Sequence, residues 1–207
     1  IALMLSFDAL VGEFERGTMM LLLTYPVKRW QVIMGKFLGH VLILFIAILV
    51  GYGGAILIMT VSTDGSMEGW QSYVVMMASS LILGAIFIAL GYLISVLVKE
   101  RATAAGAAIG LWLVFVVLYD LLLFGVLLVD EEQVISQQLF STLLLVSPTD
   151  TYRIFNLSLF DGVSQAAGIA SLASGAGMGS TLLISVMMLL VIAPLMATLV
   201  VFQRREL

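Results

Sequence analysis

The 207-residue chain contains no cysteine and only one histidine. It can therefore form no disulfide, no thiolate metal site and no cysteine nucleophile. The single histidine, His40, cannot make a conventional metal site, and we expect it to be a packed or interfacial residue. Twelve methionines could offer copper soft thioether ligands. Adjacent methionines such as Met76 and Met77 diverge on a helix, however, and methionine commonly fills gaps in apolar interiors. We therefore predict that this chain itself binds no metal or other cofactor.

Charged residues are also scarce, at 11% of the chain, while hydrophobic residues reach 62% and the mean hydropathy is +1.17. Soluble domains are about 25% charged and about 45–50% apolar. Several apolar runs exceed the roughly 20 residues that a membrane-spanning helix needs. They do not alternate with polar residues, and lipid satisfies no backbone hydrogen bonds, so we expect helices rather than strands. The composition predicts an all-α polytopic membrane protein with one domain over residues 1–207.

Four complete spans are predicted by the apolar runs, and the segments between them differ in character. The first apolar stretch, residues 1–12, is too short to cross a bilayer, so we expect it to be the end of an earlier helix. A charged segment follows at 13–36, and a mixed outer segment occupies 130–180, where residues 133–146 could form a surface helix ended by Ser147 and Pro148. The predicted spans are 37–61, 73–98, 102–129 and 181–202.

The basic residues predict the orientation of these spans. Eight of the nine lysines and arginines fall in three regions that four crossings place on the same side of the membrane. The positive-inside rule makes that side cytoplasmic, together with the C-terminus. The opposite face holds only Arg153 and is otherwise acidic. The eight residues are Arg16, Lys28, Arg29, Lys36, Lys99, Arg101, Arg204 and Arg205.

Small residues recur at helical spacing in two of the spans. Gly106 and Gly110 lie four residues apart, and Ser80, Gly84 and Gly91 share one face of the preceding span. Such stripes allow helix backbones to approach closely in lipid. Packing within one subunit and a seam between two copies both remain open.

A search for catalytic residues finds none. Asp120 is the only acid within a predicted span, and an ionisable group there is a functional candidate by default. It could be a packing residue or could lie on a substrate path. Tyr119 and Asp120 resemble half of an intramembrane aspartyl protease site, but the second aspartate is missing. The only Gly-Lys pair, Gly35-Lys36, lacks the frame of a phosphate-binding loop. Any ATP hydrolysis of that kind must therefore belong to another subunit.

The most informative stretch is the charged segment 13–36. It begins with acids, which suits a helix N-terminus, and it continues with an apolar face until Pro26, which disfavours helix before it. We expect a short helix along the inner membrane surface, anchored by Lys28, Arg29 and Trp30. Such a helix could simply cap the bundle.

Two elements of the sequence resemble the membrane subunits of ABC-2 type transporters. The first is Glu13-x-Glu15-x-Gly17-Thr18 with Leu22-Leu23, Pro26, Arg29 and Gly35-Lys36, and the second is Ser147-Pro148-x-Asp150-x-Tyr152-Arg153. The resemblance implies a transmembrane domain like that of type V exporters, with six helices per subunit, of which the first is missing here and the second truncated. It also implies a homodimer that works with two cytoplasmic ATPase subunits. The residues expected to couple to the ATPase are Glu13, Phe14, Glu15, Arg16, Gly17, Thr18, Leu22, Pro26, Arg29 and Lys36.

Within that family, residues 6–40 look most like the permeases of nitrous-oxide reductase maturation systems. That similarity implies a bacterial inner-membrane protein that works with a cytoplasmic ABC ATPase carrying ATP and magnesium, and with a periplasmic β-helical partner, in a complex that handles copper. The alternative is an ABC-2 exporter of a lipid-like or drug-like substrate. Neither function involves nucleic acid. The residues expected to contact the periplasmic partner are Asp130, Glu131, Glu132, Asp150, Tyr152 and Arg153.

Overall fold

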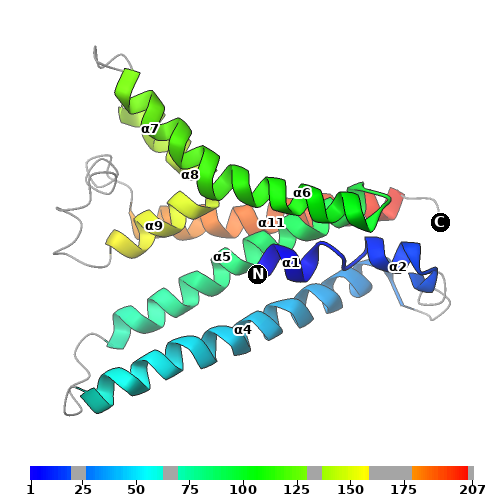
Figure 1. The fold of residues 1–207 in the computed structure, drawn as a ribbon, viewed down its shortest axis with the longest axis horizontal. Coiled ribbons are helices and arrows are strands. Elements are labelled where there is room, and N and C mark those ends of the chain that lie inside the picture. The colour runs from blue at the N-terminus through cyan, green and yellow to red at the C-terminus, as the bar shows by residue number, and fades with distance from the viewer. Residues whose placement is uncertain (20–26, 63–69, 130–136, 159–178, 205–207) are drawn as a thin grey trace.

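The structure is a computed structural model that describes residues 1–19, 27–62, 70–129, 137–158 and 179–204. All regular secondary structure in these ranges is helical (Figure 1), which confirms the prediction of an all-α protein. Five predicted site residues lie outside the described ranges and stay predictions: Leu22, Pro26, Asp130, Glu131 and Glu132.

Four helical stretches are long and apolar enough to cross a membrane. Each overlaps one predicted span, and all four run broadly along the long axis of the molecule (Figure 1). The third stretch consists of three pieces, because a π-helical segment interrupts it. The elements are α4 (Arg29–Ser62), α5 (Trp70–Leu97), α6 (Arg101–Leu113) with η1 (Val114–Leu118) and α7 (Tyr119–Val129), and α11 (Ser180–Arg204).

Helix α5 is the centre of the bundle. In its most apolar 18-residue window 56% of the residues are buried, whereas the corresponding window of α4 has none. Gly91 lets the N-terminal helix lie directly on α5, since a Cβ there would lie 3.0 Å from Ser6 Cβ and 3.4 Å from Phe7 N. Gly106 and Gly110 of α6 meet nothing within 4 Å of such a Cβ. The small residues of α5 therefore serve packing inside the subunit, and those of α6 lie on an open face.

Helix α4 begins earlier than the sequence indicated. It starts at Arg29 rather than near residue 37, and the backbone N–H of Lys28 donates to Gln31 Oε1 at 2.9 Å just before the first turn. Ile33 and Phe37, one helical turn apart, are both buried in the main core, and this apolar face explains the extension. Arg29 and Lys36, which we assigned to a separate coupling segment, thus belong to the first turns of a membrane-spanning helix.

The N-terminal segment is also divided differently. Residues 1–12, expected to be one helix end, form α1 (Ala2–Ser6), a turn, and the start of α2 (Val11–Glu15). The break is stabilised from α5, where the buried Ser95 Oγ accepts the backbone N–H groups of Leu10 at 3.0 Å and Val11 at 2.9 Å. These are donors that the first turn of a helix leaves unpaired. Helix α2 ends before Gly17, whose φ of +70° favours glycine, so the short helix expected to begin at residue 13 does not continue through Gly17.

Two shorter helices, α8 (Gln137–Val146) and α9 (Pro148–Ser158), pack at the opposite end of the bundle (Figure 1). The predicted break at Ser147 and Pro148 is present, but we did not predict a helix after it. Ser147 Oγ accepts the backbone N–H of Asp150 at 3.3 Å, and Pro148 occupies the first helical position, where its missing N–H matters little. A buried apolar cluster joins these helices to α7 and α11: Leu123, Phe140, Leu144, Ile154, Phe155 and Leu183.

Candidate functional site

Polar contacts concentrate at the end of the bundle where α2, the start of α4, the turn between α5 and α6, and the end of α11 meet (Figure 1). We call this region the collar and define it as residues 8–19, 28–36, 99–103 and 202–204. Of the basic residues that the structure describes, only Arg153 lies at the other end. Those of the collar are Arg16, Lys28, Arg29, Lys36, Lys99, Arg101 and Arg204.

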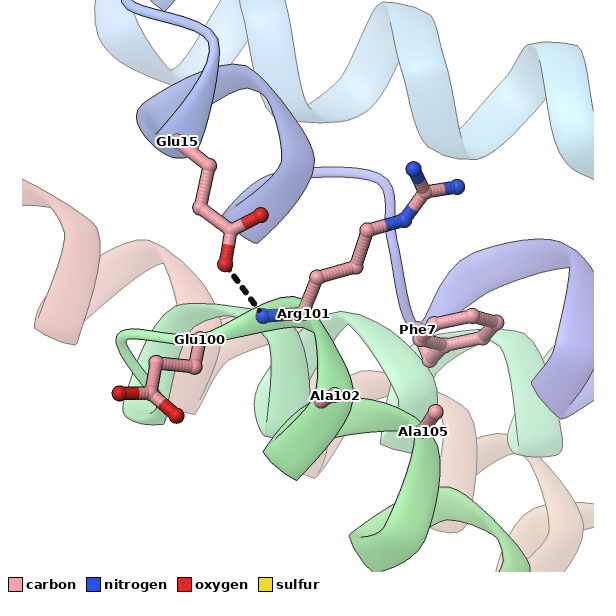
Figure 2. A pocket seen from close by; sticks show the side chains of 6 residues that line it. All are labelled: Phe7, Glu15, Glu100, Arg101, Ala102 and Ala105. Atoms are coloured by element: carbon pink, nitrogen blue, oxygen red, sulfur yellow. Dashed lines mark hydrogen bonds between the residues drawn. The ribbon is translucent and has the colours of Figure 1, made fainter.

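Glu15 connects α2 to the start of α6. Its Oε1 accepts the backbone N–H of Arg101 at 2.7 Å (Figure 2). Arg101 is the first residue of α6, and the preceding residue, Glu100, makes no side-chain capping hydrogen bond. A carboxylate at a helix N-terminus satisfies an unpaired donor and complements the helix dipole. Glu15 therefore acts as the cap of α6 from a distant part of the chain.

Asp8 strengthens the same connection. Its Oδ2 lies 2.8 Å from Arg101 Nη2 and 3.3 Å from Arg16 Nη2, and Arg16 Nε donates to Gly12 O at 3.0 Å. Gly12 leaves room for this cluster, since a Cβ there would lie 2.8 Å from Asp8 Cγ and 2.9 Å from Arg16 Nη2. Sequence reasoning did not single out Asp8, because Arg101, one of its partners, is distant in the chain.

A second set of contacts ties α2 to α4. Lys36 Nζ forms an ion pair with Glu13 and donates to Ala9 O at 2.7 Å. Both charged side chains are about three quarters buried, at 23% exposure, so this pair is screened less by water than a surface pair would be. Lys36, expected to couple directly to an ATPase, thus holds α2 on the spans in this structure.

The end of α11 completes the collar. Arg29 Nη1 donates to the backbone oxygens of Phe202 at 3.2 Å and Gln203 at 3.1 Å. A cation there satisfies carbonyls that a helix C-terminus leaves unpaired. The Phe14 ring meets the Phe202 ring edge-on, with centroids 6.1 Å apart. Two more of the predicted coupling residues, Arg29 and Phe14, therefore contact α11.

The remaining predicted coupling residues lie at the end of α2 and just after it, at the outer surface. Arg16, Gly17 and Thr18 are exposed, and the hydroxyl of Thr18 donates to Glu13 O at 3.4 Å. Glu15 is also exposed. Helix α2 thus turns one side toward the spans and leaves the other available to a partner.

A groove of about 510 Å³ opens beside this surface, between the N-terminal segment and the start of α6 (Figure 2). The carboxylates of Glu15 and Glu100 lie on its rim, and the ring of Phe7 forms part of its wall. The other lining residues are Arg101, Ala102 and Ala105.

Beneath the collar, His40 Nδ1 lies 2.7 Å from the hydroxyl of Tyr92, and the rings of Tyr92 and Phe37 pack edge-on at 6.1 Å. Tyr92 is fully buried. His40 is a packed residue, as its position at the start of a span indicated. Among the residues that the structure describes, no three His, Asp or Glu side chains come close enough to hold a metal ion.

A second polar cluster occupies the opposite end. Arg153 Nη1 lies 2.6 Å from Asp120 Oδ2 and 3.4 Å from Asp150 Oδ1. Asp120 thus joins a membrane-spanning helix to α9, which fits a packing role, while the substrate-path alternative stays a prediction. From the sequence, Asp120 and Arg153 were separate candidates, but nothing in their spacing indicated that they form an ion pair.

Two residues expected to contact an outer partner point inward instead. Asp150 is only 3% exposed, and burial raises the pKa of its carboxyl. The hydroxyl of Tyr152 lies 2.9 Å from Ser80 Oγ, which in turn lies 2.9 Å from the hydroxyl of Tyr52. Arg153, at 45% exposure, remains the one described member of that predicted surface that is substantially open to solvent.

Comparisons with known proteins agree with this architecture. Residues 1–207 match the sequence profile described as ABC-2 family transporter protein. The chain is 41% identical over 207 residues to a protein of Stutzerimonas stutzeri named "Probable ABC transporter permease protein NosY", covering 99% of this chain and 75% of that protein. It is 46% identical over 177 residues to a protein of the same name from Pseudomonas aeruginosa, covering 84% of this chain and 63% of that protein. The chain therefore belongs to the ABC-2 family of transporter proteins, as a permease subunit of an ABC transporter.

Proposed function

We propose that this permease transmits the movement of a separate cytoplasmic ATPase, docked on the collar, to a periplasmic β-helical protein that takes part in copper-site maturation of nitrous-oxide reductase. The similarity to two proteins named NosY supports the maturation role. The family membership supports an ATPase partner and a second copy of the permease. The clustering of basic residues at the collar supports a cytoplasmic location for that end and for the C-terminus.

The observation that carries the proposal is the position of α2. Glu15 connects this short helix to α6, Lys36 connects it to α4, and Phe14 connects it to α11. A partner that displaces α2 would therefore pull on the ends of three spans together. A helix that merely covered the bundle would need none of these directed contacts.

The exposed side of α2 and the residues that follow it supply a docking surface. Glu15, Arg16 and Thr18 offer charged and polar groups there, and the groove beside them adds an apolar wall. Charged groups at the edge of an interface affect the orientation and association rate of a partner more than its affinity. The ATP and magnesium belong to the docked ATPase, and the permease contributes no catalytic group.

Copper, in this proposal, is handled by the complex and not by this chain. Cysteine is absent from the sequence, so the soft ligands that copper favours would have to come from methionine or from the partner. The periplasmic partner is the natural carrier, and the permease provides movement at the outer face.

The decisive experiment is gentle purification of the full-length permease from membranes, followed by identification of the proteins that accompany it. Recovery of an ABC ATPase together with a periplasmic repeat protein supports the proposal. Recovery of the ATPase alone favours an exporter of a lipid-like or drug-like substrate. If no ATPase accompanies the permease, docking at the collar is refuted.

A further inference from the structure

Two carboxyl groups and one guanidinium meet where α9 lies beside α7, at the end of the bundle remote from the collar. Arg153 Nη1 lies 2.6 Å from Asp120 Oδ2 but 3.4 Å from Asp150 Oδ1. The short contact is typical of a charge-assisted hydrogen bond, and the long one is near the limit of a hydrogen bond. Arg153 thus pairs closely with Asp120 and only loosely with Asp150.

Asp150 is the more buried of the two acids. Its side chain is 3% exposed, compared with 34% for Asp120. Its Oδ1 faces Arg153 across the long contact, and its Oδ2 is buried without a hydrogen-bond partner among the described residues. A buried carboxylate with an unpartnered oxygen is strongly disfavoured in its charged form.

The described residues of the neighbouring elements supply no second positive charge. From α7, Asp120 and Tyr119 approach, and the Tyr119 hydroxyl already donates to Leu143 O at 2.6 Å. From α5, Ser79 and Ser80 face α9, and they bond to Asn156 and Tyr152. The described parts of α8 and η1 contain no acidic or basic residue. Tyr52 of α4 is bonded to Ser80, and Tyr73 of α5 is bonded to Met59. The other ionisable residues of α5 and α11, Tyr92 and Arg204, lie toward the collar.

One guanidinium therefore has to balance two carboxyl groups. We propose that Asp120 and Asp150 hold a single proton between them, carried on Asp150, so that this end of the permease contains a proton-binding site. With the proton bound, the charges of Asp120 and Arg153 cancel and Asp150 is neutral. Release of the proton to water leaves the cluster with one net negative charge.

The electrostatic surroundings agree with this assignment. Burial is the main cause that raises the pKa of Asp150, and the nearby charge of Asp120 raises it further. The side chain of Ser147 and the charge of Arg153 act in the opposite direction. Two negative charges at one site repel each other, so the charged form of the buried Asp150 is disfavoured beside the Asp120 carboxylate.

Occupancy of the proton site should affect the contact between α9 and α7. When Asp150 is neutral, Arg153 pairs with Asp120 alone, and this ion pair holds α9 against α7. When Asp150 ionises, it competes for the same guanidinium and weakens that link. Asp120 is the second residue after η1, and π-helical segments are frequent at functional sites. A rise in pH through the titration of Asp150 should therefore loosen α9 from the third span.

Infrared spectroscopy of the full-length permease in its complex tests the site directly, because a protonated carboxyl has its own C=O stretching band. In the wild-type protein the band of Asp150 should titrate with a midpoint above the ordinary aspartate pKa of 3.8. Asp150→Asn should abolish it. Asp120→Asn should shift its titration to lower pH, since Arg153 then pairs with Asp150 alone. Asp8→Asn, which removes a carboxyl from the collar, should leave it unchanged.

A wild-type band with its midpoint at the ordinary aspartate pKa would overturn the proposal, as would an undiminished band in Asp150→Asn. If Asp150→Asn does not fold, the Asp120→Asn titration decides, and an unshifted band overturns the proposal. The test needs no ATP hydrolysis and no cargo, so its outcome is independent of the coupling function proposed above.

Discussion

Replacement of Glu15 by arginine gives the sharpest test of the collar. In the wild-type protein, Glu15 Oε1 accepts the N–H of Arg101 at 2.7 Å and caps α6. The arginine side chain has no acceptor, so that N–H loses its partner. The new guanidinium would also lie near Arg101 and would replace an acid on the docking surface. Glu15→Arg should therefore uncouple the permease from its ATPase.

The size of the effect follows from the lost cap. Loss of a helix cap typically amounts to about 1 kcal/mol, and about 1.4 kcal/mol corresponds to a tenfold change in an equilibrium constant. The state in which α2 lies against the start of α6 should thus become about fivefold less populated through loss of the cap alone. Repulsion between the new arginine and Arg101 would lower its population further. The assay is the ATPase activity of the reconstituted complex, together with the amount of ATPase that co-purifies with the permease.

Glu15→Gln provides the matched control. The glutamine amide oxygen can still accept the Arg101 N–H, so this variant keeps the cap and removes only the charge. We expect it to retain most of the coupling. Unchanged ATPase stimulation and unchanged co-purification in Glu15→Arg would refute the docking role of α2, and equal losses in both variants would show that charge, not capping, is what matters.

Three further predictions concern individual side chains. Gly17→Ala should lower the free energy of unfolding by about 1–2 kcal/mol, because the backbone there is left-handed, with φ +70°. Gly17→Asn should lower it less. Thermal unfolding of the purified permease measures both variants, and equal losses would contradict the backbone argument. Gly12→Ala should lower the unfolding temperature by displacing Asp8 and Arg16, while Gly110→Ala, which meets open space, should not, and equal effects would show that the Asp8 cluster is not responsible. Asp120→Asn should leave membrane insertion and dimerisation intact and should at most alter the ATP turnover of the complex. Membrane extraction measures insertion and native electrophoresis measures dimerisation. Loss of either property would show a structural role for Asp120.

The sequence was sufficient for the features that depend on local composition. The apolar runs predicted four helical spans, because lipid leaves only helices or closed barrels to satisfy the backbone and these runs do not alternate with polar residues. The break at Ser147 and Pro148 followed from the chemistry of a helix boundary. The resemblance of residues 13–36 to the ABC-2 family agrees with the family that the comparisons show. Each of these inferences requires only a short window of residues.

Other features could not be read from short windows. The start of α4 was placed too late because charged residues at a membrane surface and charged residues in a helical turn have the same composition. The break between α1 and α2 depends on Ser95 of α5, which accepts two N–H groups of the N-terminal segment. Nothing in the sequence of that segment indicates this contact. The π-helical segment at Val114–Leu118 has no composition that distinguishes it from the α-helix on either side.

The sequence by itself thus determined that this protein is a bundle of membrane-spanning helices, and it indicated which end carries the positive charge. Only the tertiary structure decided which charges meet. Glu15 caps a helix that begins 86 residues later, and Arg153 pairs with an aspartate 33 residues earlier. Hydropathy is a property of a short window, so it can be summed along the chain. Pairing depends on how each helix is rotated and how closely it packs against its neighbours, and those quantities exist only after the bundle has assembled.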